Sequence, residues 1–257
     1  MSNTRITTEQ TCRMEADLTA QFRNFPFGLE ESFALGCRLL AAEGHSRALL
    51  GQVTARDGDG NYLTVPFGQG LDEADAQTLV RFDDDLRPLN GGPMVNPGVR
   101  FHVWIYKHRP DVRAIVHTHP PASVALAMTQ NPLRTVSMDA AMLYGTVGYL
   151  DHWPGTPDGD AEGELISGAL GDCSSMLLCN HGLLTVGSTF QQAVYRAVFF
   201  EWAAAAQLSA SAIGPLKEVE QGAAENARHA MTRDTYINAT MGYLYRKVQR
   251  SRGSAAP

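Results

Sequence analysis

The most constraining feature of this chain is an apolar run that ends in two histidines, residues 114–119 (AIVHTH). Side chains two positions apart in a β-strand point to the same face, so a strand here presents the imidazoles of His117 and His119 side by side. A second apolar run, residues 176–184, is interrupted at His181. Three neutral imidazoles with an open fourth position are a typical ligand set for a catalytic divalent metal. The alternative to a metal site is that His117 and His119 belong to an ordinary strand edge and that His181 is an ordinary turn residue.

Composition narrows the class of protein. The chain has 257 residues, 44% of them hydrophobic and 19% charged, with a net charge of -6. This balance is ordinary for a globular protein and offers no basic block for a phosphate backbone, so we expect neither a nucleic-acid partner nor a membrane partner. The N-terminus lacks the apolar segment of a signal peptide. Four cysteines without paired spacing favour free thiols in a reducing cytoplasm, with Cys179 either a fourth metal ligand or a small buried residue.

Strand-like and helix-like segments alternate along the chain, which predicts a layered α/β domain. Residues 1–27 are polar and are expected to form an irregular N-terminal arm. The main domain is expected over residues 28–210, with a short helix at 72–79, and a C-terminal helical tail over residues 211–257.

Six short strings together carry a resemblance to a known family. They are, in order, residues 51–56 (GQVTAR), 65–68 (VPFG), 100–102 (RFH), 108–111 (HRPD), 114–119 (AIVHTH) and 180–183 (NHGL). In order and spacing this set resembles the class II aldolase/adducin family, from about residue 28 to about residue 208.

The resemblance implies a single-domain, three-layer α/β/α sandwich that assembles as a homotetramer. It also implies one divalent metal per chain, held by the residues that match the family's histidines, His117, His119 and His181. Zinc is the expected metal, with iron, manganese and cobalt as alternatives. The assembly would place the site near a subunit boundary, where Tyr236, Tyr243 and Tyr245 of the tail either reach a neighbour's site or pack as an ordinary helix.

Departures from the family pattern change the expected substrate. Sugar-phosphate aldolases of the family carry a catalytic glutamate that one residue separates from the Arg-Phe-His string, and this position is Gly98 here. Residues that help hold phosphate in those aldolases are also changed here, to Gln52, Phe67 and Asn96, while Gly68 keeps the family's glycine. We expect these five positions to contact the substrate, and we expect that substrate to lack a phosphate.

Decarboxylation fits a site that keeps the metal and loses the carboxylate, because departure of CO₂ itself generates the carbanion. We therefore expect a metal-dependent carbon–carbon lyase. Its reaction would be decarboxylation of a hydroxyaromatic or keto acid, or aldol chemistry on a small unphosphorylated molecule. A non-haem iron oxygenase on the same scaffold is one alternative, since three histidines also suit Fe(II). A non-catalytic, adducin-like interaction module is the other.

The sequence offers two candidates for the missing proton shuttle, Asp139 and Tyr144, in the segment 137–145 (SMDAAMLYG). Asp139 can instead cap a helix, and Tyr144 can be a core aromatic residue. Arg100 can bind a carboxylate, although a salt bridge on the helix surface is the preferred interpretation.

Overall fold

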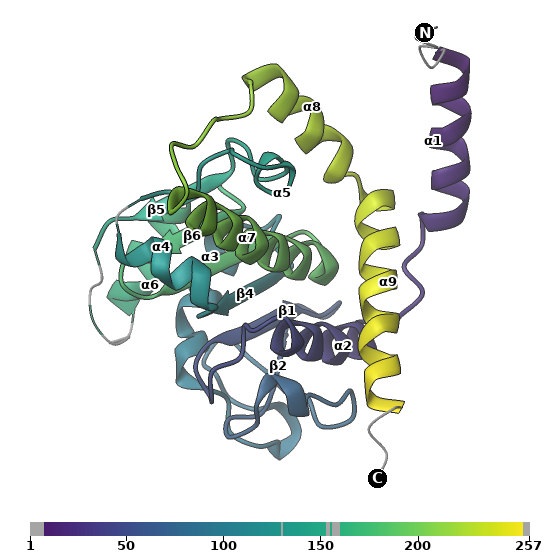
Figure 1. Ribbon diagram of the computed structural model, residues 1–257. Helices are drawn as coiled ribbons and strands as arrows, with labels where there is room; N and C mark the ends of the chain where they lie inside the picture. Colours follow the sequence, from purple (N-terminus) through teal and green to yellow (C-terminus); the bar gives the residue numbers. More distant parts are fainter. Residues whose placement is uncertain (1–7, 130, 153–154, 156–159, 254–257) are drawn as a thin grey trace, which may run out of the picture.

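A seven-stranded sheet with the strand order β3-β2-β1-β4-β7-β6-β5 forms the centre of the molecule (Figure 1). The computed structural model describes residues 8–129, 131–152, 155 and 160–253. Neighbouring strands are antiparallel except for β5 and β6, which are parallel. The strands are β1 (Gln52–Arg56), β2 (Tyr62–Thr64), β3 (Val80–Phe82), β4 (Ala114–Thr118), β5 (Val147–Leu150), β6 (Ser175–Leu178) and β7 (Gly182–Gly187).

Helices connect the strands and cover the sheet. The α-helices are α1 (Thr8–Phe22), α2 (Leu29–Ala42), α3 (Arg100–His108), α4 (Pro121–Met128), α5 (Met138–Ala141), α6 (Asp160–Leu170), α7 (Phe190–Ser211), α8 (Gln221–Met231) and α9 (Asp234–Gly253). Three short 3₁₀ turns are η1 (Leu71–Glu73), η2 (Leu89–Gly91) and η3 (Pro97–Val99).

The sheet separates two hydrophobic cores. Helices α2, α4, α7 and α9 pack on one face, and α3 and α6 pack on the other. Alternation along β4 shows the division, because Ala114 and Val116 belong to the first core and Ile115 belongs to the second. The predicted three-layer α/β/α sandwich in a single domain is confirmed.

The expectation of an irregular N-terminal arm is wrong, because residues 8–22 form helix α1. From residue 11 onward nearly all of its side chains are exposed, and the helix is polar in composition, so little burial marks this segment as a helix. The helix lies beside α9 (Figure 1), where Arg233 forms a 2.9 Å ion pair with Glu15.

The short helix expected at 72–79 is also wrong. The chain makes only the turn η1 there, and Asp75 then accepts a hydrogen bond from the backbone N–H of Gln77 at 2.9 Å. An aspartate that binds the backbone two residues ahead favours a turn over a continued helix.

The tail is helical, and its last helix belongs to the first core. Tyr245 is fully buried against the rings of Phe25 and Phe27, at centroid distances of 5.6 and 5.8 Å. Tyr245 therefore packs within its own chain, as the alternative interpretation has it, whereas Tyr243 stays exposed. None of the described helices has the length and apolar character needed to span a bilayer. The division of the chain at residue 210 stays a prediction.

Candidate metal centre

Strand β4 delivers two of the three histidines to the α3 and α6 side of the sheet. His117 lies opposite Gln52 of β1 and Leu184 of β7 in the register, near the end of β4. Its ring contacts Phe101 of α3 edge-on, at a centroid distance of 5.3 Å. His119 follows just beyond the strand and, because it is two residues on, its side chain lies toward the same side.

The tight turn between β6 and β7 supplies the third histidine, His181. Asn180 before it adopts a left-handed conformation with φ of 54°. At Gly182 after it, an added Cβ atom would lie 2.6 Å from Cδ2 of His119 and 2.7 Å from the carbonyl oxygen of Thr118. Only glycine leaves the room for His119 to lie against this turn.

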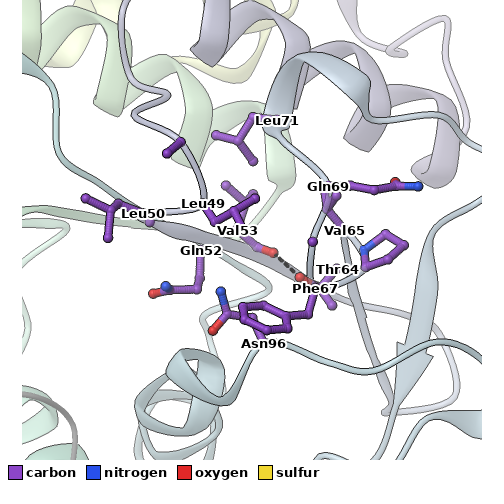
Figure 2. Close-up of a pocket in the computed structure, with 14 residues that line it drawn as sticks. Leu49, Leu50, Gln52, Val53, Thr64, Val65, Phe67, Gln69, Leu71 and Asn96 are labelled. Carbon is purple, nitrogen blue, oxygen red and sulfur yellow. Dashed lines mark hydrogen bonds between the residues drawn. The ribbon is translucent and has the colours of Figure 1, made fainter.

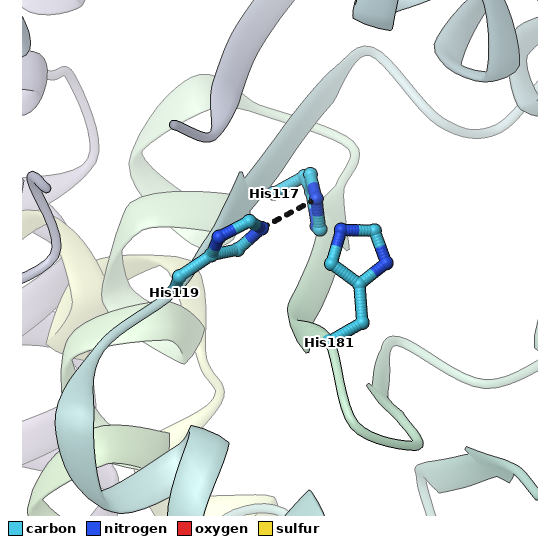
Figure 3. A group of neighbouring side chains, drawn as sticks. All are labelled: His117, His119 and His181. Carbon is cyan, nitrogen blue, oxygen red and sulfur yellow. Dashed lines mark hydrogen bonds between the residues drawn. The ribbon is translucent and has the colours of Figure 1, made fainter. Parts of the chain in front are cut away.

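The three rings surround a common point (Figure 3). Their centroids are 4.8 to 4.9 Å apart, and one nitrogen of each ring lies within 4.8 Å of the others. The Nε2 atoms of His117 and His119 are 3.1 Å apart. Two nitrogens at about 2.1 Å from one ion in tetrahedral geometry are separated by roughly 3.4 Å, so the donor set fits a metal with small side-chain adjustments.

Burial keeps these imidazoles in the neutral form that binds metals. It lowers the pKa of His181 to about 4, with a further contribution from His119. Burial and the two neighbouring histidines hold the pKa of His117 well below its usual range. The Nδ1–H of His117 donates to the carbonyl oxygen of Leu183 at 3.1 Å, which leaves the Nε2 lone pair facing the other rings.

Buried hydrogen bonds on the opposite face of the sheet fix the segment that carries His117 and His119. Thr118 points to the opposite face of the sheet, where its hydroxyl is 2.8 Å from Nδ1 of His45. Helix α4 starts immediately afterwards, and Glu201 of α7 accepts hydrogen bonds from its first-turn amides at Ala122 and Ser123, both at 2.8 Å. The backbone on both sides of His119 is thereby fixed.

A cavity of about 590 Å³ opens in front of the histidines. Its walls are mainly apolar and are formed by Leu49, Leu50, Gly51, Gln52, Phe67, Asn96, Gly98, Phe101, His117, His119, Gly155, Glu162, Asn180 and His181. An adjoining hollow of about 30 Å³ shares part of this wall, and Figure 2 shows Gln52, Phe67 and Asn96 gathered beside it. The structure thus brings the three histidines together with four of the five expected substrate positions.

Gly98 and Gln52 are in direct contact in this wall. An added Cβ atom at position 98 would lie 2.8 Å from Nε2 of Gln52. The Gln52 amide therefore occupies the room that a larger residue at position 98 would need. Asn96 caps the adjacent turn η3 by accepting a hydrogen bond from the backbone N–H of Gly98 at 2.9 Å, so its side-chain nitrogen remains a donor.

Three expected site residues lie outside the main cavity. Gly68 lines only the small hollow. Asp139 lies in α5, which packs against α7 and α8, and Tyr144 lines a separate hollow of about 110 Å³. The capping role considered for Asp139 is wrong too, because Ser137 accepts the capping hydrogen bond from Ala140. Within one chain, neither residue lines the cavity of the histidines, and their role as proton shuttles stays a prediction.

The cavity contains a carboxyl group that the sequence patterns did not indicate, Glu162 of α6. It is only 6% exposed, and burial raises its pKa. In the sequence it is one of several acids at the start of a helix, where acids are common. Arg100 makes the surface salt bridge considered for it, at 2.8 Å from Asp160, and buried Cys179 is not part of the histidine donor group.

Comparison with known proteins finds relatives of two kinds, a decarboxylase and adducin-related proteins. It is 30% identical to 3,4-dihydroxyphthalate decarboxylase of Arthrobacter keyseri over 75% of this chain and 83% of that protein. It is 33% identical to adducin-related protein 1 of Caenorhabditis elegans over 73% of this chain, but spans only 27% of that longer protein.

Solved structures of aldolases have a similar fold. An L-fuculose 1-phosphate aldolase from Glaciozyma antarctica PI12 superimposes with a TM-score of 0.79 at 26% identity, over 88% of this chain and 90% of that one. The model of the class II aldolase and adducin N-terminal domain matches residues 31–208. The chain therefore belongs to the class II aldolase and adducin N-terminal domain family.

Proposed function

We propose that this protein is a divalent-metal-dependent carbon–carbon lyase that decarboxylates a hydroxyaromatic or keto acid, or performs aldol chemistry on an unphosphorylated substrate. The observation that carries the proposal is a complete histidine triad in a cavity lined by Gly98, the position that the family resemblance matches to the glutamate of the sugar-phosphate aldolases. The likeness to 3,4-dihydroxyphthalate decarboxylase supports decarboxylation as the first choice.

His117, His119 and His181 would hold the metal, and we propose zinc, with iron, manganese and cobalt as alternatives. When bound, a divalent cation with three neutral ligands supplies positive charge that stabilises the negative charge developing on a substrate oxygen. Because the three pKa values are lowered, the histidines can bind the ion without first losing protons at neutral pH.

The cavity wall favours a planar substrate with few charges. Phe67 is 46% exposed at the mouth and offers a ring on which an aromatic substrate can stack. The amides of Gln52 and Asn96 can bind hydroxyl or carboxylate oxygens. No lysine or arginine lines the described wall of the cavity, which supports the expectation that a sugar phosphate is a poor substrate.

Two alternatives stay open. A non-haem iron oxygenase is favoured by the all-histidine ligand set, which suits Fe(II). A non-catalytic interaction module is favoured by the adducin relatives. The intact triad and the adjoining cavity support catalysis over the second alternative.

We also propose a homotetramer in the cytoplasm, with the cavity mouth near a subunit boundary. Leu50 and Met94 are 56% and 58% exposed close to the mouth, and a neighbouring subunit would cover such apolar side chains. All four cysteines are free thiols, which agrees with a reducing compartment. Light scattering tests the assembly, because a particle of 27.9 kDa would be a single chain.

The experiment combines metal analysis with a substrate screen. The purified protein and its His117→Ala, His119→Ala and His181→Ala variants are analysed by plasma mass spectrometry. Release of CO₂ is then measured from hydroxyaromatic and 2-keto acids, with fuculose 1-phosphate for comparison. We expect one metal per chain, lost in each variant, and CO₂ release that depends on it. Full metal occupancy in two of the variants would contradict the site, and iron with oxygen consumption would favour the oxygenase.

A further inference from the structure

Among the residues that the structure describes, Glu162 is the one acidic residue that lines the cavity in front of the histidines. Its side chain is almost completely buried, at 6% exposure. The carboxylate is not part of the group of donor atoms formed by the three histidines, although Glu162 lines the same cavity. A substrate that binds in the cavity therefore has the histidines and Glu162 within the same enclosure.

Helix packing fixes the position of Glu162. Two residues earlier, Asp160 accepts hydrogen bonds from Arg100 at 2.8 Å and from the indole N–H of Trp104 at 2.9 Å, which ties the start of α6 to α3. At the next position, an added Cβ atom on Gly163 would lie 2.4 Å from Cδ1 of Trp104. Glycine thus allows α6 to approach α3 closely, and Glu162 is held between two anchored neighbours.

The surroundings of Glu162 favour its protonated form. Among the residues that the structure describes, no cation or hydrogen-bond donor pairs with its carboxylate, and Arg100 is already bound to Asp160. A buried carboxylate without a partner is unfavourable, so burial raises the pKa of Glu162. A carboxyl group that is buried, lies beside a substrate cavity and has no structural partner is a candidate acid catalyst.

We propose that Glu162 is the proton donor of this cavity and delivers a proton to the substrate carbon that loses CO₂. This role rests on the proposed decarboxylase function. The bond between the carboxylate and the substrate carbon breaks, CO₂ departs, and the electron pair stays on that carbon. The carbon then takes the carboxyl proton of Glu162, and the resulting carboxylate takes a proton from water. Glu162 would thereby supply the acid function that Gly98 cannot, from another element of the fold.

The test compares Glu162→Gln with Glu162→Asp and with a control on the same helix, Glu164→Gln. Glu164 is exposed, so its substitution leaves the cavity unchanged. Loss of a positioned general acid typically lowers the rate about 10²–10⁴-fold, and we expect this loss in kcat for Glu162→Gln with KM changed only a few-fold. Glu162→Asp should recover part of the rate, the control should be normal, and all three should bind metal as the wild type does.

A second measurement does not depend on the substrate. Infrared titration of the metal-free protein follows carboxyl protonation, and the band that disappears in Glu162→Gln should titrate above the ordinary range for glutamate. Normal kcat in Glu162→Gln, or titration of that band at or below the ordinary range, would overturn the proposal. If the wild-type protein releases CO₂ from no acid, the decarboxylase function fails, and the titration still decides whether Glu162 is a buried acid.

Discussion

Glu201 is predicted to be one of the most sensitive positions for stability, because it caps a helix from outside. Helix α4 begins at Pro121, which has no N–H, and its N-cap residue Pro120 has no side chain that can accept a hydrogen bond. The carboxylate of Glu201 replaces that cap by accepting the N–H groups of Ala122 and Ser123, each at 2.8 Å, and the Ser123 hydroxyl at 2.7 Å. A negative charge at this end also complements the helix dipole.

The size of the effect follows from the donors that would lose their partner. In Glu201→Ala, two buried amides remain unpaired, at roughly 1–3 kcal/mol each, while the Ser123 hydroxyl can rotate toward another acceptor. Partial entry of water reduces this sum, so we expect the free energy of unfolding to fall by about 3–4 kcal/mol. Glu201→Gln keeps the shape and one acceptor and should lose about 1–3 kcal/mol. Ser123→Ala removes only the hydroxyl and should lose about 1 kcal/mol.

Urea unfolding of the metal-free proteins, followed by circular dichroism, measures these differences. The three substitutions should rank as Glu201→Ala, then Glu201→Gln, then Ser123→Ala. The double variant Glu201→Gln/Ser123→Ala should lose less than the sum of its parts, since both changes remove the same hydrogen bond. A loss below about 1 kcal/mol in Glu201→Ala would refute the argument, because an ordinary cap contributes that much.

Three further predictions concern the site and the buried histidines. Gly182→Ala should weaken metal binding at least tenfold in competition with a chelator, because its Cβ atom would meet His119 at 2.6 Å; unchanged affinity would contradict this. Gly98→Glu should lower CO₂ release and give no useful cleavage of fuculose 1-phosphate, because Gln52 occupies the room that the new side chain needs. Burial lowers the pKa of both His45 and His102 to about 3. Below pH 6.5 the unfolded chain therefore binds protons that the folded chain does not, and each histidine should lower the free energy of unfolding by about 2 kcal/mol at pH 5, measured in urea without metal. His102→Gln should reduce this pH dependence, and an equal slope in both proteins would count against it.

The histidine pair on β4 could be predicted because its geometry is local. A period of two residues places His117 and His119 on one face wherever the strand lies. The turn histidine, His181, is more than sixty positions away along the chain; the sequence pattern offers it only as a possible third ligand, and the family resemblance matches all three to one site. Glu162 could not be found in this way, since its position depends on how closely α6 packs against α3 at Gly163.

The differences between expectation and structure have related causes. Asp139 as a proton shuttle stays a prediction: the resemblance matches its segment to a substrate-facing one, whereas in a single chain α5 packs against α7 and α8 and Asp139 does not line the cavity. Helix α1 differs from the expected irregular arm because its composition is polar and its side chains from residue 11 onward are mostly exposed, so burial gives little indication of it. Hydrophobic periodicity in a sequence indicates which elements are buried against their neighbours. It gives no indication where that burial is small or depends on residues far away in the sequence.

The contact between α9 and α2 has a consequence for the order in which the molecule matures during synthesis. Residues at both ends of the sequence complete one core, because Tyr245 and Met241 of α9 are buried in the same cluster as Phe33 of α2. The part of α2 that α9 covers thus leaves the ribosome early and stays uncovered until α9 has been translated, whereas η1 and α7 can cover the rest before then. Such a chain is expected to fold mainly after release and to need protection by chaperones before then. Ribosome-bound chains that stop before α9 should accordingly be cut readily by protease, whereas the released protein should resist.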